Sequence, residues 1–418
     1  MTQVMPTPAQ LRWQQLEFGA FIHFGINTFA GKEWSDGTIP ASTFNPSELD
    51  AGSWVRVAKE AGARYLVLTA KHHDGFCLWP TTTTDYSVAS SPWRGGKGDV
   101  VRDVAQACAE QGIGLGLYLS PWDRNADCYS DSAAYDDFYL QQLTELCTGY
   151  GPLMELWFDG AGSVGREYDW DRIIAVVKEH QPEAMIFNMG QPTIRWVGNE
   201  NGLALDPVNY VVDRTSDTQY TDSSSGLGTA HYLPPECDVS IRRGWFWHPD
   251  DEVKSTGHLL AIYYQSVGMG ANLLLNLPPD TRGLIPDEDA QRLREWKAEL
   301  DRRLSGAVEA TVEHHDGGAT LSFPAAVTFN HLELVEDLSS GQRITHHVVS
   351  GDDSKLVEGK TVGNRRIHQL PVVTAKRLHV KLSGEGGSMA SARVYTGALD
   401  AAVPAIPEGY EAPTDAPD

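Results

Sequence analysis

The stretch RYLVLTAKHHDGF, residues 64–76, is an apolar run that ends on two histidines. Its pattern recurs along the chain, and this repetition decides the fold. Runs of this kind are typical of buried β-strands, and helix-like sequence separates most of them. Alternating strands and helices predict an α/β fold with a parallel sheet closed into a (β/α)8-like, TIM-type barrel. Three further runs share the pattern: FGAFIHFG (18–25), IGLGLYLSPWD (113–123) and LMELWFDGA (153–161).

Polar side chains stand at the carboxyl ends of these predicted strands. In a barrel of parallel strands those ends form one face, and the chemistry of such barrels takes place there. We therefore expect imidazoles, a phenol and carboxylates to converge in one pocket suited to sugar chemistry. The residues concerned are His23, His72, His73, Tyr118, Asp123 and Asp159.

The distribution of tryptophan and the change in the pattern of apolar residues divide the chain into two domains and a tail. All twelve tryptophans lie between Trp13 and Trp296. A charged amphipathic helix predicted over 287–304 closes a catalytic barrel domain of residues 1–304. Short alternating runs then predict an antiparallel β-sandwich over 305–398, followed by a Pro- and Ala-rich, loosely ordered tail at 399–418.

One long segment inside the barrel lacks any regular pattern. Residues 205–235 are polar and rich in Gly and Ser, so we expect a loop without strands or helices. In the sandwich the aromatic residues are few: Phe323, Phe329 and Tyr395, with no Trp. A structural role is therefore expected for that domain, not a sugar-stacking surface.

Composition narrows the possible partners. The formal net charge is −23 and the pI is near 4.9, which disfavours nucleic acid and anionic membrane surfaces. Five cysteines without a CxxC pair suggest free thiols in a reducing compartment. With no signal-peptide pattern and no apolar run of membrane-spanning length, we expect a cytoplasmic protein. Nothing in the sequence indicates an oligomeric state.

Asp159 is the strongest candidate for a catalytic group. Its carboxylate follows the apolar run of LWFDG and should emerge into the pocket. Aspartates at strand ends also commonly cap the next turn, so this alternative stays open. A carboxylate among Trp and Tyr rings suits an oxocarbenium-like transition state, as nucleophile or as electrostatic partner.

The His72–His73–Asp74 cluster raises the alternative of a metal site. Neighbouring residues on a strand point to opposite sides, and no other Cys/His set has ligand spacing. We therefore expect hydrogen bonds to sugar hydroxyls, with no metal and no cofactor. His23 has the alternative of a core histidine with a backbone partner.

Retaining hydrolysis of a glycoside needs a second carboxyl group roughly 5 Å from the first, able to hold a proton near neutral pH. Glu200, beside Trp196 in RWVGNENG, lies where a loop could carry it over the pocket. Glu236 in PPECDVS is its main rival, and spacing alone does not choose between them. The full set of candidates is Glu33, Glu200, Asp206, Glu236 and Asp238.

Several blocks, in order and at matching spacing, resemble glycoside hydrolase family 29, the retaining α-L-fucosidases. They span about residues 12–300 and comprise WQQLEFGAFIHFGINTF, the Glu33–Trp34 pair, FNPSELDAGSWVRVAKEAGARYLVLTAKHHDGFCLW, SPWRGGKGDVVRDV and LWFDGA. The resemblance implies that Asp159 is the nucleophile. It implies substrate contacts for His23, Glu33, Trp34, His72, His73, Tyr118 and Trp245.

Two further motifs resemble one subgroup of that family, which is selective for α-1,3/1,4-linked fucose in branched, Lewis-type structures. These motifs are IRWVGNENG (194–202) and PECDVSIRRGWFWH (235–248), with Arg243 where proline is usual. In the subgroup the Glu of RWxGNE is the acid/base, which implies this role for Glu200. The predicted protein is thus an exo-acting α-L-fucosidase whose partner is a fucosylated oligosaccharide. The alternatives are a broad-specificity α-L-fucosidase and a non-catalytic sugar-binding barrel.

Overall fold

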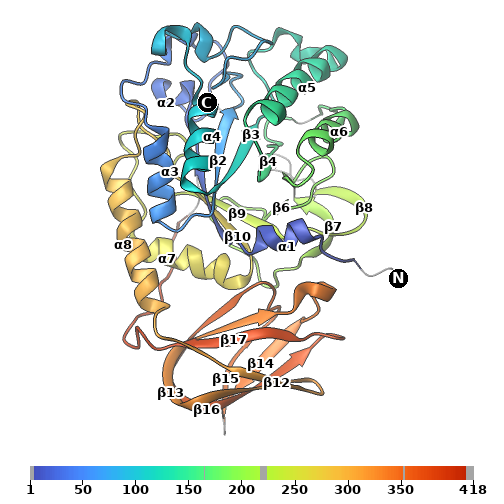
Figure 1. Cartoon of the computed structure of the whole chain (residues 1–418), viewed down its shortest axis with the longest axis vertical. Coiled ribbons are helices and arrows are strands. Elements are labelled where there is room, and N and C mark those ends of the chain that lie inside the picture. Colours follow the sequence, from blue (N-terminus) through green and yellow to red (C-terminus); the bar gives the residue numbers. More distant parts are fainter. Residues whose placement is uncertain (1–3, 164, 217–223, 352–353, 411–418) are drawn as a thin grey trace.

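Eight parallel strands form a nearly closed barrel in the computed structural model, which describes residues 4–163, 165–216, 224–351 and 354–410 (Figure 1). The two end strands of the sheet approach each other through a parallel bridge between Phe187 and Ile194. The predicted (β/α)8-like fold is confirmed. In chain order the strands are β1 (Phe18–Ile22), β2 (Tyr65–Lys71), β3 (Gly114–Leu119), β4 (Glu155–Trp157), β5 (Met185–Phe187), β6 (Arg195–Trp196), β9 (Pro235–Ser240) and β10 (Asn272–Asn276).

Most of the barrel strands are rich in apolar residues because both of their faces are buried, whereas β9 also buries Glu236, Asp238 and Ser240. Along β2 the side chains alternate. Leu66 and Leu68 belong to the main core between the strands and the helices, whereas Tyr65 and Val67 fill the barrel interior. The interior cluster also holds Tyr118, so the aromatic side chains beneath the pocket are packed core residues.

Helices cover the outside of the barrel (Figure 1). Most of them begin at a capping side chain that accepts a backbone hydrogen bond, as Asp50, Asp99, Asp131, Asp169 and Ser255 do. α1 precedes the barrel and α2 is a short helix after β1. The bounds are α1 (Pro8–Gln14), α2 (Ile26–Ala30), α3 (Ala51–Glu60), α4 (Val100–Gln111), α5 (Ser132–Gly149), α6 (Trp170–His180), α7 (Thr256–Gln265) and α8 (Asp287–Arg303). No helix among the described residues is long and apolar enough to cross a membrane.

Two connections of the barrel have no α-helix in their described parts, 188–194 and 197–234. The second contains an antiparallel pair, β7 (Val211–Ser216) and β8 (Ser224–Tyr232). The expectation of a loop without strands over 205–235 is therefore wrong, although 217–223 lie outside the described residues. Most β7 side chains are exposed or half-buried, so no apolar alternation marks this strand in the sequence.

The C-terminal strands form the predicted antiparallel β-sandwich, below the barrel in Figure 1. Some apolar runs that are separate in the sequence belong to one long strand in the structure. In β13 and β16, shifts in the pairing register let each strand continue past a break in its hydrogen bonding. The break in β13 surrounds Pro324, which lacks the N–H that a sheet ladder needs. The strands are β11 (Ala307–Glu309), β12 (Thr311–His315), β13 (Gly318–Glu336), β14 (His346–Ser350), β15 (Lys355–Gly359), β16 (Arg366–Ser383) and β17 (Met389–Tyr395).

Two segments connect the sandwich to the barrel. α8 runs along the side of the barrel toward the sandwich (Figure 1). The predicted tail, 399–418, returns to the barrel in its described part: Arg303 Nη1 donates to the Ala402 carbonyl over 2.8 Å, and Ile406 packs against the barrel core. Residues 411–418 lie outside the described residues.

Candidate active site

A pocket opens at the carboxyl ends of the barrel strands. Eight of the nine residues predicted to act in catalysis or to contact the substrate line it, and the ninth, Glu33, lies behind its wall. Further lining residues are Phe21, Trp157, Phe158, Gly160, Ala161, Phe187, Asn188, Trp196 and Asp238. The predicted ones among the lining are His23, Trp34, His72, His73, Tyr118, Asp159, Glu200 and Trp245.

Asp159 follows β4 by two residues and presents its two oxygens differently. Oδ1 accepts the backbone N–H of Ala161 over 2.9 Å, which caps the following turn. Oδ2 accepts the phenol proton of Tyr118 over 3.0 Å. The Asp159 side chain is 18% exposed, whereas its neighbour His73 is 1% exposed. The two interpretations from sequence therefore both hold. Oδ1 caps the following turn, and Oδ2 lies on the side of the pocket beside Tyr118.

The neighbouring His73 faces Asp159 with an unprotonated nitrogen. Its Nδ1 lies 2.7 Å from Ser120 Oγ, and that hydroxyl donates its only proton to the carbonyl of Trp122. Nδ1 must then be the donor, so Nε2 carries no proton; it lies 3.6 Å from Asp159 Oδ2. Burial lowers the pKa of His73 to about 4, so the ring is neutral at neutral pH. Nε2 can accept a hydrogen bond from a ligand hydroxyl beside Asp159.

His23 is held in the same neutral form, with its proton on Nδ1, by a different partner. Its backbone N–H and its Nδ1 both contact Asn276 Oδ1, at 3.1 and 3.0 Å. The Asn276 amide donates in turn to the Trp245 carbonyl over 2.8 Å, which fixes its orientation. Nδ1 is therefore the donor and Nε2 the acceptor, and burial lowers the pKa of His23 to about 3. Its partner is a side-chain amide where the alternative interpretation had a backbone group.

His72 and His73 both line the pocket although they are sequence neighbours. β2 ends at Lys71, so the alternation of side chains along a strand no longer applies to them. Their ring centroids lie 4.2 Å apart, and the His72 ring stacks on Tyr118 at 5.7 Å. Burial lowers the pKa of His72. No group of three His, Cys, Asp or Glu side chains that could hold a metal ion occurs among the described residues.

Glu33 supports the pocket wall from behind. Its Oε2 accepts the backbone N–H groups of Trp245 and Phe246 over 2.8 and 3.3 Å. Trp245 lines the pocket with its ring 5.0 Å from that of His23. Trp34, next to Glu33 in sequence, lines the pocket with its ring 5.2 Å from the His73 ring.

Glu200 lines the pocket from the segment that follows β6. In β6 itself, Trp196 donates its indole N–H to Asp238 Oδ1 over 2.7 Å. Asp238, in β9, also lines the pocket, and burial raises its pKa to about 8. At neutral pH this carboxyl group is mostly protonated, so it can donate a hydrogen bond to a ligand.

Glu236, the rival of Glu200, does not line the pocket. It is fully buried, and its two oxygens accept hydrogen bonds from Tyr65 Oη at 2.5 Å and from Trp157 Nε1 at 3.0 Å. Trp157 lines the pocket and Glu236 holds it in place. Burial also raises the pKa of Glu236 and of the nearby Glu155 carboxyl group. Another candidate, Asp206, forms an ion pair with Arg366 of the sandwich.

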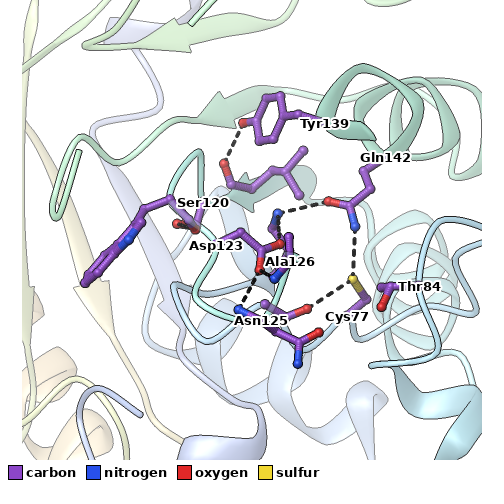
Figure 2. Close-up of polar contacts among 12 residues, drawn as sticks. Cys77, Thr84, Ser120, Asp123, Asn125, Ala126, Tyr139 and Gln142 are labelled. Atoms are coloured by element: carbon purple, nitrogen blue, oxygen red, sulfur yellow. Dashed lines mark hydrogen bonds and ion pairs between the residues drawn. The ribbon is translucent and has the colours of Figure 1, made fainter. Parts of the chain in front are cut away.

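Asp123 does not line the pocket, contrary to expectation. It is buried and accepts the Lys71 ammonium over 2.9 Å, while its other oxygen accepts the backbone N–H of Asn125 over 3.0 Å. Figure 2 shows Asp123, Asn125 and Gln142 of this network. The side-chain oxygen of Gln142 also accepts a hydrogen bond from the Lys71 ammonium over 2.9 Å. A fully buried ammonium needs a counter-charge, and Asp123 supplies it.

Asn188 is a pocket residue that the sequence interpretation missed. It follows β5 with a positive φ of 56°, and its Oδ1 accepts the backbone N–H of Trp196 over 3.1 Å. The signal was present, because Asn188 is the polar residue at the end of AMIFN, as His23 and Asp159 are in their strands.

A (β/α)8-like barrel with carboxylates, neutral imidazoles and tryptophans at its strand ends is the architecture of a glycoside hydrolase. The model of the α-L-fucosidase family matches residues 38–301. The chain belongs to this family, glycoside hydrolase family 29.

Individual relatives agree with this family. α-L-Fucosidase 1 of Arabidopsis thaliana is 41% identical over 422 residues, covering 90% of this chain and 83% of the relative. A glycoside hydrolase 29 family member from a rumen bacterium superimposes with a TM-score of 0.86 at 35% identity, over 94% of this chain and 78% of the other. A Ruminococcus gnavus family 29 fucosidase in complex with fucose gives 0.80 at 28% identity, over 94% of both chains.

Proposed function

We propose that this protein is a retaining, exo-acting α-L-fucosidase that removes α-1,3/1,4-linked fucose from branched, Lewis-type oligosaccharides. Asp159 is the nucleophile and Glu200 the acid/base in this proposal. The observation that carries it is the presentation of Asp159: a carboxylate oriented by Tyr118 and Ala161, on a pocket wall, with Glu200 on the same pocket. Membership of the α-L-fucosidase family and the fucose complex of a relative support the choice of sugar.

The reaction proceeds in two displacements. In the first, Asp159 attacks the anomeric carbon of fucose while Glu200 gives its proton to the glycosidic oxygen, and the leaving sugar departs as an alcohol. In the second, the Glu200 carboxylate takes a proton from water, the water oxygen attacks the same carbon, and the bond to Asp159 breaks. Two inversions leave the configuration of the product unchanged.

Binding of fucose requires donors and acceptors that do not compete for the proton of the acid/base. The bare Nε2 atoms of His23 and His73 accept from sugar hydroxyls, and low pKa values of about 3 and 4 keep both rings neutral. Asp238, with its pKa near 8, can donate to a sugar oxygen. Hydroxyl-rich ligands suit this mixture of neutral acceptors and a neutral donor.

The linkage preference rests on the similarity of the segments around Glu200 and Trp245 to the α-1,3/1,4-selective subgroup. The experiment compares Lewis-type trisaccharides with α-1,2- and α-1,6-linked fucosides and an aryl fucoside, and follows the first-formed anomer by NMR. We expect α-fucose first, and turnover of the Lewis-type trisaccharides far above the rest. Comparable turnover of every substrate would instead identify a broad-specificity enzyme, and no turnover would identify a sugar-binding barrel.

A further inference from the structure

The described end of the chain crosses from the sandwich to the barrel as a strap, residues 399–410. Asn330 of β13 donates to the Ala398 carbonyl over 2.8 Å, just before the strap begins. Arg302 and Arg303 of α8 then bind Asp400 and the Ala402 carbonyl, at 3.1 and 2.8 Å. The strap thus passes over the end of α8 and reaches α7 with its last described residue, Tyr410.

Tyr410 packs at the carboxyl end of β9. Its ring meets the His258 ring of α7 edge-on, with centroids 4.4 Å apart. The Lys254 ammonium lies 5.1 Å from the centre of the Tyr410 ring. That ammonium donates to the carbonyls of Ser240 and Arg242, at 2.7 Å each, where β9 ends. The ring therefore covers the junction between β9 and α7.

The segment that carries Glu200 rests on the same face of α7. His258 and Ile262 are spaced i and i+4, so their side chains share one side of the helix. Ala204 donates its backbone N–H to the Gln265 carbonyl over 2.8 Å. A Cβ at Gly202 would stand 2.7 Å from Val239 Cγ1 of β9 and 3.0 Å from Ile262 Cγ2 of α7, so the segment packs against both elements.

Tyr410 and Glu200 are also electrostatic neighbours. Burial, followed by the negative charge of Glu200, raises the pKa of Tyr410 to about 12. The connection 197–234 has no helix in its described part to hold it on the barrel. An acid must stay within hydrogen-bond reach of the leaving oxygen, so its segment needs support from elsewhere.

We propose that Tyr410 is a positioning residue for Glu200: its ring holds the α7 face on which the Glu200 segment rests. The inference depends on the acid/base role of Glu200 in the proposed function. In this proposal the C-terminal strap helps to hold Glu200 in position, and it does so through the ring of Tyr410 rather than its hydroxyl.

The test compares Tyr410→Ala with Tyr410→Phe in the full chain. For a Lewis-type trisaccharide, Tyr410→Ala should lower kcat about ten- to a hundredfold with KM unchanged, because a displaced acid protonates the leaving oxygen poorly. The fucosylation burst with a dinitrophenyl fucoside should be unchanged, since that leaving group needs little protonation. Tyr410→Phe, which keeps the ring, and Val403→Ala, 69% exposed on the same strap, should match the parent.

Two outcomes would overturn the inference. Equal losses on both substrates with a lower melting temperature would reduce Tyr410 to a structural role, and a rise in KM alone would make it a contact for the leaving sugar. If Tyr410→Ala does not fold, His258→Leu removes the same ring contact from the α7 side. Glu200→Ala is assayed in parallel: if it lacks the same substrate dependence, the proposed function has failed, separately from the role of the strap.

Discussion

The phenol of Tyr118 donates a hydrogen bond to Oδ2 of Asp159 over 3.0 Å, from the end of β3 to the end of β4. Burial and the Asp159 charge raise the pKa of Tyr118 well above its usual range, so the phenol keeps its proton and remains a donor. Asp159 is thereby fixed by a neutral group that cannot take its charge. Such a bond orients Asp159 without forming an ion pair.

Removing this bond should slow the enzyme without unfolding it. Hydrogen bonds to charged groups contribute about 1.5–3 kcal/mol, so Tyr118→Phe should lower kcat/KM by roughly ten- to a hundredfold. Steady-state kinetics on a fucoside measures the effect. Tyr86→Phe is the control, because the Tyr86 hydroxyl is buried without a hydrogen-bond partner among the described residues. A similar loss in both variants would contradict a specific role for the Tyr118 phenol.

Asp159→Ala should abolish turnover by several orders of magnitude while the protein stays folded and binds fucose, because the covalent intermediate cannot form. Sodium azide should restore part of the rate with an aryl fucoside by entering the vacated space, giving the β-fucosyl azide. NMR of the product identifies its configuration. Near-normal hydrolysis by the Asp159→Ala variant would remove Asp159 from the mechanism.

Glu200→Ala should affect substrates according to their leaving groups. Hydrolysis of a Lewis-type trisaccharide should fall by about 10²–10⁴, whereas the first step with an activated aryl fucoside should change little. Slow deglycosylation should then give a burst in stopped-flow traces.

Glu236→Gln is the comparison for this variant, since Glu236 lies beneath the pocket and holds Trp157. Its effect should be similar for both substrates. If the substrate dependence appears with Glu236→Gln and is missing with Glu200→Ala, the acid/base is Glu236.

Asp238 should make stability depend on pH. Its pKa rises from 3.8 in the unfolded chain to about 8 in the fold, so between these values only the native state holds the proton. Stability from this group is therefore lost as pH rises from about 4 to 8. Asp238→Asn has no such proton, and its melting temperature relative to the parent should increase between pH 5 and 8. A difference that is constant across this range would contradict the assignment.

The buried Lys71–Asp123 pair should matter greatly for stability. Asp123→Asn leaves the ammonium without its counter-charge and should cost about 3–5 kcal/mol in urea unfolding. Asp103→Asn breaks a pair with Arg94 at the surface and should cost about 0–1 kcal/mol. Equal costs would mean that water or another group compensates Lys71.

The barrel and most of its pocket were predictable because each depends on local sequence. A strand buried on both faces is an apolar run, and the residue after it lies at the carboxyl end, which is how Asp159 and His23 were found. The same reasoning fails for Asp123, which does not directly follow β3 and does not line the pocket. Its position is decided by Lys71, 52 residues earlier, and no local pattern records such a partner. The β7–β8 hairpin escaped prediction for a related reason, because its exposed faces carry no apolar alternation.

The part of the barrel between β5 and β9, residues 188–234, has no helix among its described residues, and this has a consequence for how the enzyme could be rebuilt. Asp159, the proposed nucleophile, follows β4, which lies between α5 and α6 in the chain, whereas Glu200 stands on a segment with no helix among its described residues. Chain exchange between Asn188 and Pro235 would therefore replace Glu200, the proposed acid/base, together with strand β6 and its pocket residue Trp196, and would leave the pocket residues of β1 to β4 in place. Libraries aimed at new leaving groups would be built there, with the junctions at these two residues.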